Sequence, residues 1–243
     1  MESIASRLQT TRQRIHRAYS AAGRGEPDAE TLLAVSKTQP ATAVREALAA
    51  GQHAFGENYV QEALAKIEAL AELRPQLVWH LIGPLQSNKT RPVAEAFDWV
   101  HSVDRLKIAQ RLAEQRPAWL PPLNICLQVN VDGGSSKSGV APGEALALAR
   151  AVADLPGERL RLRGLMSIPE PVPAAAGPAA QRAPHRALRE LYDALRAHGL
   201  ALDTLSMGMS ADLEAAIAEG ATLVRVGTAV FGERTARAVQ QAR

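Results

Sequence analysis

The chain has 243 residues, of which 47% are hydrophobic and 22% are charged, and its formal net charge is +3. This composition is typical of a soluble globular protein, and the weak charge with only 4% aromatic residues argues against nucleic-acid binding. No apolar run reaches the roughly 18 residues of a membrane span, and the charged segment 1–20 lacks the apolar core of a signal peptide. The single cysteine, Cys126, excludes an internal disulfide and fits a reducing compartment, so we expect a cytoplasmic protein.

The spacing of apolar residues predicts a helix over 1–20, followed by repeating pairs of a short strand and an alanine-rich helix. The predicted strands span 31–37, 53–57, 77–83, 99–104, 123–132, 160–169, 202–208 and 222–228. The predicted helices that follow them span 40–50, 60–70, 88–96, 105–115, 143–155, 185–199, 210–220 and 233–243. Pro40 is suited to a first helical turn and Gly51 to a helix C-terminus.

Strands that alternate with helices in this way predict a parallel sheet, and eight such units predict a single (β/α)8 barrel. We expect this barrel to occupy residues 1–243 as one domain. The proline- and alanine-rich segment 169–184 is predicted to be a surface loop after the sixth strand. Because functional residues of such barrels lie at the carboxyl ends of the strands, the residues that end or follow each strand are the candidates for a site.

Lys37 ends the first apolar strand, directly before a turn. A lysine in a partly dry barrel mouth loses some affinity for its proton, and a neutral amine attacks aldehydes to form a Schiff base. The alternative is a lysine that reaches water or pairs with Glu57. Lys37 is therefore a candidate nucleophile.

Two turns with glycine and hydroxyl residues follow the last two strands. Ser210 is predicted to be the N-cap of the helix after the seventh strand, and Gly227 and Thr228 end the eighth. Free backbone N–H groups and the helix dipole can bind an anion there, and the loops after strands seven and eight are the usual phosphate site of this fold. The alternative is that Ser210 only caps its helix.

Arg225 interrupts the otherwise apolar strand 222–228. A buried guanidinium needs a partner, either a carboxylate or a ligand atom in the barrel mouth. A lysine reactive toward aldehydes, a phosphate site and a buried arginine together suggest pyridoxal 5′-phosphate (PLP), which carries an aldehyde, a phosphate and a ring nitrogen that accepts a hydrogen bond.

Several long motifs in this order resemble the YggS/PROSC family, the pyridoxal phosphate homeostasis proteins, from end to end. The resemblance rests on LLAVSKTQP, FGENYVQE, WHLIGPLQSNK, VNVDGGSSKSG, RGLMSIP and LSMGMSADLEAAIAEGATLVRVGTAVFGER. It implies the fold of the N-terminal barrel of alanine racemase, fold type III among PLP proteins. The segment from Glu170 to Pro184 departs from the acidic segment that is usual in the family, which puts any partner contact there in doubt.

The resemblance also implies roles for single residues. Lys37 matches the lysine that forms an internal aldimine with PLP, and Arg225 matches the arginine that faces the pyridine nitrogen. The other implied cofactor-binding positions are Ser210, Gly227 and Thr228 at the phosphate, Met207 and Gly208 in the same turn, and Asn58 and His80 lining the pocket. Lys89 and Lys137 match further lysines of the motifs and imply a secondary or transient contact with the cofactor.

An arginine has no acceptor to offer, so the nitrogen it faces stays unprotonated and PLP becomes a poorer electron sink. Racemisation also needs a second base, which alanine racemase takes from a second domain of a partner subunit. This chain ends soon after the eighth strand and offers only Tyr19, Tyr59 and Tyr192. We therefore expect a carrier or buffer in PLP homeostasis, not an enzyme, with no catalytic residue and no metal.

Two alternatives stay open: a PLP-dependent amino-acid racemase with an unrecognised second base, and an aldolase that uses Lys37 on a sugar phosphate. The expected partners are PLP and PLP-dependent apo-enzymes, with no nucleic acid and no membrane. A barrel without a second domain is expected to be a monomer.

Overall fold

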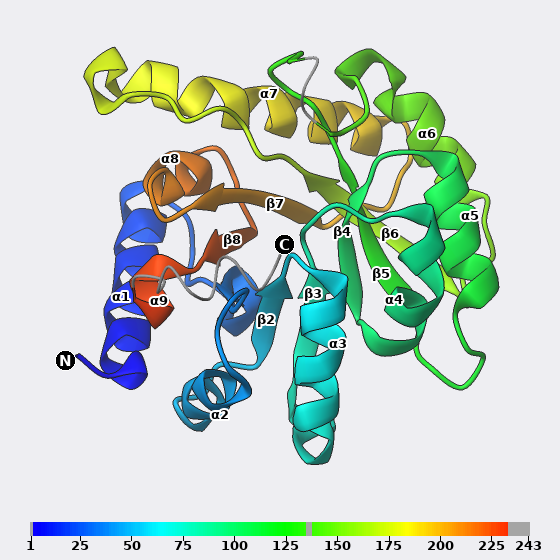
Figure 1. Ribbon diagram of the computed structural model, residues 1–243. Helices are drawn as coiled ribbons and strands as arrows, with labels where there is room; N and C mark the ends of the chain where they lie inside the picture. The colour runs from blue at the N-terminus through cyan, green and yellow to red at the C-terminus, as the bar shows by residue number, and fades with distance from the viewer. Residues whose placement is uncertain (1, 135–137, 233–243) are drawn as a thin grey trace.

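The computed structural model describes residues 2–134 and 138–232, in which parallel strands close into a barrel in the order β1 to β8 (Figure 1). The strands are β1 (Leu32–Val35), β2 (Ala54–Glu57), β3 (Val78–Leu81), β4 (Trp99–Val103), β5 (Leu123–Gln128), β6 (Leu160–Met166), β7 (Thr204–Met209) and β8 (Leu223–Val226). The ring closes because β8 pairs with β1, where Arg225 lies beside Leu33. The predicted (β/α)8 barrel is confirmed.

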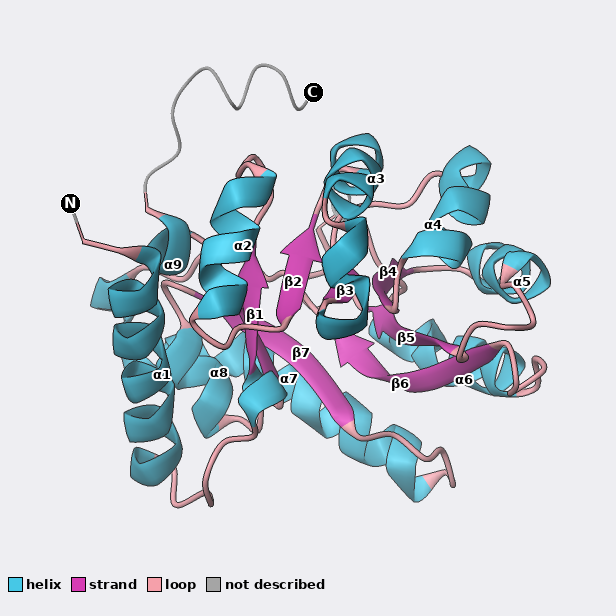
Figure 2. Ribbon diagram, turned by 90° about the horizontal axis from the view of Figure 1, so that it is seen from below, coloured by secondary structure: helices cyan, strands magenta, loops and turns pink. Residues whose placement is uncertain are grey.

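Helices surround the strands on the outside (Figure 2). They are α1 (Ile4–Ala21), α2 (Ala41–Ala49), α3 (Val60–Ala69), α4 (Thr90–Ala96), α5 (Leu106–Gln115), α6 (Ala145–Ala153), α7 (Gly177–Ala197), α8 (Leu213–Ala218) and α9 (Thr228–Phe231). Short 3-10 turns are η1 (Ala29–Thr31), η2 (Ala71–Gln76), η3 (Ser87–Lys89), η4 (Pro142–Glu144) and η5 (Ala174–Ala176). The helix predicted over 233–243 lies outside the described residues.

Side chains alternate between the two faces of the barrel wall. Leu33 and Val35 of β1 form a cluster inside the barrel together with Ala54, Ile82 and Leu223. Their neighbours on β1 belong instead to the large core between the strands and the helices. This two-residue period sets which side chains reach the interior, and fully burying a leucine here contributes roughly 1.5–3 kcal/mol.

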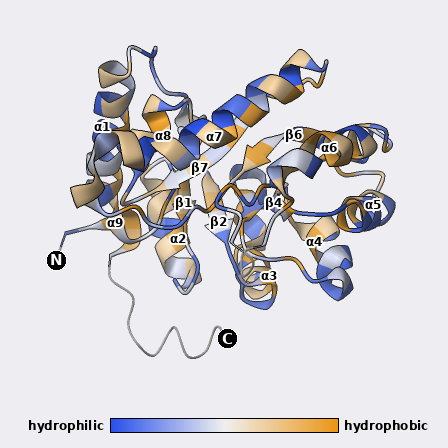
Figure 3. Cartoon of the chain, turned by 90° about the horizontal axis from the view of Figure 1, so that it is seen from above, coloured by the Kyte–Doolittle hydropathy of each residue, from blue (hydrophilic) through white to orange (hydrophobic). Residues whose placement is uncertain are grey.

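The segment 169–184 is not the loop that the sequence predicted, because α7 begins within it at Gly177. Pro178 occupies the first turn, where no backbone N–H is required. Pro184 lies in the helix interior and costs about 3 kcal/mol there, so the helix needs other stabilisation. Hydrophilic and hydrophobic residues alternate along α7 (Figure 3), and its hydrophobic side packs on the barrel.

A cluster of ion pairs fastens the first half of α7 to the end of α8. The carboxylate of Glu219, which is buried, accepts hydrogen bonds of 2.7, 3.0 and 3.3 Å. The donors, which share one face of α7, are Arg182, Arg186 and Arg189. These contacts explain why a proline-containing segment is helical: tertiary ion pairs and packing outweigh its weak local propensity.

Glu219→Gln is expected to destabilise the protein by about 1–2 kcal/mol at neutral pH. Burial would raise the pKa of Glu219, but the hydrogen bonds from the three arginines outweigh burial and hold the pKa below its usual value. The carboxylate therefore stabilises the fold above the ordinary pKa of glutamate, and this contribution is lost as the pH falls through the lowered folded-state pKa. Thermal unfolding of both proteins from neutral to acidic pH measures it. A gap in Tm that does not narrow in acid would contradict the assignment.

Three further features of the described residues bear on function. Within residues 2–134 and 138–232, no helix has both the length and the apolar character needed to cross a membrane. No group of three or more metal-ligating side chains gathers in these same two ranges. Cys126 is a free thiol, fully buried in the barrel interior beside Trp99 and Met166, so it acts as a small apolar side chain.

Candidate functional site

Lys37 lies at the carboxyl end of the barrel, which we call the rim, two residues after β1 ends. Because Leu33 and Val35 point into the barrel, the period of the strand directs Lys37 to the same side. The side chain is half-buried. Thr38 follows with a φ of 63°, so the chain turns away immediately after the lysine. Lys37 therefore follows β1 at the barrel mouth, and its role there stays a prediction.

A buried ion cluster that the sequence analysis missed lies behind this segment, between the barrel wall and α3. Lys66 Nζ donates to Glu57 Oε1 at 2.6 Å and to Glu62 Oε1 at 3.0 Å. Glu57 is fully buried and Lys66 is nearly so. Burial raises the pKa of Glu57, and the charge of Lys66 opposes that change. The signal was present in the sequence, since Lys66 falls on the same apolar helical stripe as Ala63.

The same cluster holds the backbone on both sides of Lys37. Lys66 Nζ donates to the carbonyl oxygen of Ser36 at 2.8 Å, and Ser36 Oγ donates to Glu57 Oε1 at 2.6 Å. The backbone N–H of Thr38 donates to Glu62 Oε1 at 2.6 Å. The peptide units before and after Lys37 are therefore fixed by charge-assisted hydrogen bonds, so the backbone from which its side chain extends is held in place.

Arg225 extends from β8 into the barrel, where it is 3% exposed. Its NH1 donates to the carbonyl oxygen of Ser206 at 2.7 Å and to Ser206 Oγ at 2.8 Å, and its NH2 donates to the carbonyl oxygen of Ser167 at 2.7 Å. Among the described residues, no carboxylate forms a hydrogen bond with it. Burial lowers the pKa of Arg225 to about 10, so the guanidinium remains charged at neutral pH.

The sequence predicted His80 at the rim, but the structure places it deeper in the barrel, within β3. The stagger of the barrel sets His80 beside Trp99, the first residue of β4, and the two rings stack at 5.2 Å. His80 Nδ1 is 3.0 Å from His101 Nε2, and His101 Nδ1 is 2.9 Å from Ser206 Oγ. A buried polar chain thus runs from Arg225 through Ser206 and His101 to His80. Contact of His80 with a cofactor at the rim stays a prediction.

The turn after β7 differs in detail from the prediction. Ser210 is not the N-cap of α8, because the helix begins at Leu213 with Asp212 as its N-cap. Asp212 Oδ1 accepts the N–H of Met209 at 2.6 Å, which closes the turn before the helix starts. Arg14 of α1 donates to the carbonyl oxygen of Ser210 at 2.9 Å. Ser210 therefore remains in a fixed turn at the rim without a capping role.

Gly208 and Met207 precede this turn. Gly208 has a φ of 90°, and a Cβ there would lie 2.5 Å from Ala216 Cβ, so no other residue fits. Met207 is fully buried in the core between the barrel and the helices, on the opposite face from Ser206. Only its backbone belongs to the rim.

The turn after β8 is the second half of the predicted phosphate site. Gly227 is the N-cap of α9, which starts at Thr228. The first N–H groups of a helix have no acceptor within the helix, so those of Thr228 and Ala229 are available to an anion. Met209 and Arg225 pair across β7 and β8, which places both turns on the same side of the rim.

The remaining candidates lie around the same mouth. Asn58 follows β2, and its Oδ1 is buried without a hydrogen-bond partner in the part of the chain described. Lys89 is half-buried at the end of η3, in the connection from β3 to α4. Lys137 lies outside the described residues. The role of each in cofactor binding stays a prediction.

The residues at the rim fit the cofactor that the sequence suggested. Two N–H groups of the Arg225 guanidinium have no acceptor in residues 2–134 and 138–232. Ser167 Oγ and Asn58 Oδ1 are buried and unpartnered in the same ranges. Lys37 suits an aldehyde, and the buried guanidinium, which has no carboxylate hydrogen-bonded to it within those ranges, suits a ring acceptor. The N–H groups at the two turns suit an anion.

The fold and the rim define a (β/α)8 barrel of the alanine racemase N-terminal domain class, and the sequence profile of that family matches residues 7–235. A relative from Pseudomonas aeruginosa named pyridoxal phosphate homeostasis protein is 64% identical over 234 residues, which cover 96% of this chain and 97% of the relative. The Escherichia coli K12 relative of the same name is 53% identical over 235 residues, which cover 96% and 98%. This chain belongs to the family of pyridoxal phosphate homeostasis proteins.

Solved structures agree with this assignment. PipY from Synechococcus elongatus, solved without PLP, matches with a TM-score of 0.81 at 42% identity over 95% of this chain and 100% of that chain. PipY with PLP bound matches with a TM-score of 0.79 at 41% identity over the same shares, 95% and 100%. The resemblance inferred from the motifs is confirmed.

Proposed function

We propose that the chain binds PLP covalently through Lys37 Nζ at the rim and serves PLP homeostasis as a carrier, without turning over a substrate. The relatives' shared name and the PLP-bound form of PipY support the cofactor. The observation that carries the proposal is Arg225, a buried guanidinium without a carboxylate partner among the described residues, two residues before the turn proposed for the phosphate. When bound, PLP supplies an aldehyde that reacts with amines.

Each residue of the proposed site has its own role. Lys37 Nζ in its neutral form would be the nucleophile toward the aldehyde, and the Lys66 cluster holds the backbone on both sides of it. The turns of Ser210 and Thr228 hold the phosphate through backbone N–H groups and hydroxyls. Arg225 would donate a hydrogen bond to the ring nitrogen, and its pKa of about 10 keeps its own proton in place at neutral pH.

The same arginine weighs against catalysis, because an unprotonated ring withdraws electrons poorly. The positions of the tyrosines also weigh against catalysis. Tyr19 Oη donates to the carbonyl oxygen of Ala221 at 3.3 Å, and Tyr192 Oη donates to that of Leu202 at 2.9 Å, both just before strands begin and far from the rim. Only Tyr59, 36% exposed and following β2, lies near the mouth. A racemase would have to recruit this residue.

The test is to incubate the PLP-loaded protein with L- or D-alanine and other amino acids and to follow enantiomer composition and exchange of the α-hydrogen. We expect rates no higher than those of free PLP at the same concentration. Exchange above that rate would overturn the carrier proposal. If Tyr59→Phe then removed the excess while PLP loading stayed unchanged, the racemase alternative would replace it.

We also propose that the chain is a single-domain monomer of the cytoplasm that delivers PLP to PLP-dependent apo-enzymes. The family assignment and the net charge of +3, too weak to demand a nucleic acid or a membrane surface, support this. Mixing the loaded protein with a PLP-dependent apo-enzyme should restore its activity faster than the spontaneous release of PLP allows. Recovery no faster than spontaneous release would contradict delivery.

A further inference from the structure

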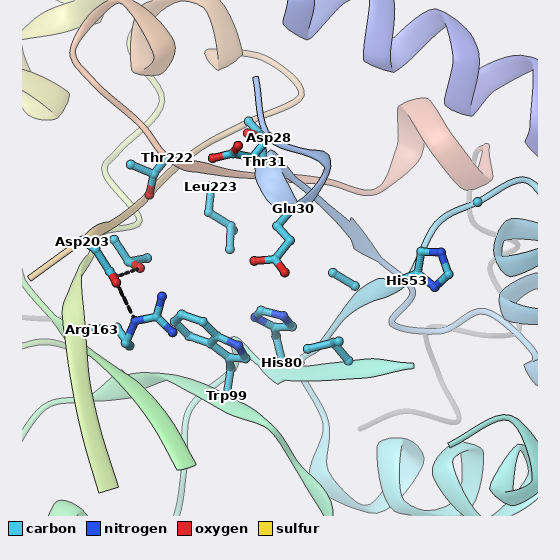
Figure 4. Close-up of a pocket in the computed structure, with 14 residues that line it drawn as sticks. Asp28, Glu30, Thr31, His53, His80, Trp99, Arg163, Asp203, Thr222 and Leu223 are labelled. Carbon is cyan, nitrogen blue, oxygen red and sulfur yellow. Dashed lines mark hydrogen bonds and ion pairs between the residues drawn. The ribbon is translucent and has the colours of Figure 1, made fainter. Parts of the chain in front are cut away.

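The end of the barrel opposite the rim opens into a cavity of about 480 Å³, which we call the lower cavity (Figure 4). Its walls are formed by the residues at which strands begin, including Thr31, Ala54, Val78, Trp99, Thr204 and Leu223. This volume lies within the roughly 300–1,000 Å³ typical of small-molecule sites. The lower cavity is separate from the proposed PLP site, since the interior of the barrel lies between them.

The unpaired charge of the lower cavity is negative. Asp28 and Glu30 belong to the segment before β1, and their carboxylates form neither a hydrogen bond nor an ion pair with any described residue. The cationic Arg163 on the opposite wall is neutralised by Asp203, to which its Nε donates at 2.9 Å (Figure 4). His53 Nδ1 is occupied by the carbonyl oxygen of Gln76 at 2.9 Å. The mouth of the cavity therefore favours a cation.

The inner end of the cavity offers a hydrogen-bond donor. Arg225 can only donate, so Ser206 Oγ accepts from it and can pass its own proton toward His101 Nδ1. Burial lowers the pKa of His80 to about 3 and that of His101 well below its usual value, so both rings are neutral. A neutral His101 that accepts at Nδ1 must donate from Nε2.

We assign this tautomer because it gives the Ser206 hydroxyl proton an acceptor, and in it His80 accepts at Nδ1 and carries its proton on Nε2. The ring is only 3% exposed and lines the lower cavity, and Nε2 has no acceptor among the residues that the structure describes. Figure 4 shows the ring at the floor of the cavity, with the Glu30 side chain also turned into it. Because Nε2–H faces the cavity and not another part of the described chain, a ligand or water in the cavity has to supply its acceptor.

We propose that the lower cavity is a second ligand site, which binds a small organic cation carrying a hydrogen-bond acceptor, such as an amino alcohol. The cationic nitrogen lies at the mouth between Asp28 and Glu30, and the acceptor receives the His80 Nε2–H. The aliphatic part of the ligand contacts Val78 and Leu223, which supply apolar walls. Charge at the mouth and a donor at the floor select for both ends of the ligand.

Choline is a suitable probe, because its quaternary nitrogen has no N–H and cannot react with the aldehyde of PLP. The neutral isostere 3,3-dimethylbutan-1-ol has the same shape and hydroxyl group but no charge. Calorimetric titration of the full chain loaded with PLP should show that choline binds about tenfold more tightly than the isostere, which corresponds to about 1.4 kcal/mol. Equal affinities, or no binding of choline, would overturn the proposal.

The double variant Asp28→Asn/Glu30→Gln should weaken choline binding about tenfold and leave the isostere unaffected. Glu95→Gln/Glu144→Gln is the matched control, because it removes the same charge from exposed positions that do not line the cavity. An equal loss in the control would assign the effect to net charge and refute the site.

A second measurement needs no variant, so it tests the proposal even if the Asp28→Asn/Glu30→Gln protein folds poorly. In the unmodified protein, titration with choline should shift the NMR signals of His80 Nε2 and of the indole N–H of Trp99, which both line the cavity. The indole N–H of Trp119, which is 83% exposed and does not line it, is the internal reference. Shifts confined to Trp119 would overturn the proposal.

Discussion

Lys37→Ala is expected to abolish the covalent attachment of PLP while the fold remains intact. The half-buried Lys37 follows the end of β1, and the turns after β7 and β8 that we propose for the phosphate are untouched by the change. PLP should therefore still bind, but only weakly and reversibly. Borohydride reduction followed by peptide mass spectrometry measures the covalent adduct, and circular dichroism monitors the fold.

Lys89→Ala is the matched control, because it removes another half-buried lysine from the β3–α4 connection. It should retain a full yield of adduct on Lys37. A pyridoxyl adduct of unchanged yield in Lys37→Ala, or its loss only in Lys89→Ala, would move the covalent site away from β1 and contradict the central assignment.

Lys66→Met is expected to lower the free energy of unfolding by about 3–5 kcal/mol, because it leaves the buried Glu57 carboxylate without its counter-charge. Urea unfolding measures the loss. Lys107→Met is the control: it removes an exposed lysine from α5 and should cost less than about 0.5 kcal/mol. A loss for Lys66→Met no larger than for the control would show that the ion pair does not stabilise the fold.

The double variant Glu57→Gln/Lys66→Met separates the contribution of the cluster to the stability of the fold from its contribution to the positioning of Lys37. Removing both charges together should recover most of the lost stability, since the fully buried carboxylate is gone and only the partly exposed Glu62 loses its lysine partner. The hydrogen bond from Lys66 Nζ to the Ser36 carbonyl oxygen is still missing, and Ser36 Oγ has lost its charged acceptor, so Lys37 should form its adduct with PLP more slowly than in the parent protein. Full recovery of both stability and rate would show that the cluster has no part in orienting the lysine.

Much of the fold was predictable, because each unit of a (β/α)8 barrel carries its own local signal. The apolar runs predicted every strand of the barrel to within a few residues, and the position of Gly51 after α2 was predicted from its turn chemistry, with a φ of 77°. Lys37 and Arg225 could be singled out because a charged residue at or within an apolar strand is costly unless it has a partner or a ligand. The predicted start of α7 was wrong because the ion pairs with Glu219 that stabilise its first half join residues far apart in the sequence.

The sequence by itself therefore determined the barrel, the inward lysine and the two turns at the rim, since all of these follow from periodicity and turn residues within short segments. Only the tertiary structure decided which polar groups meet. His101 and Ser206 are 105 residues apart in the chain, and Arg14 and Glu214 are 200 apart. The stagger of the strands, which no local pattern encodes, set His80 beside Trp99 and opened the lower cavity beneath it.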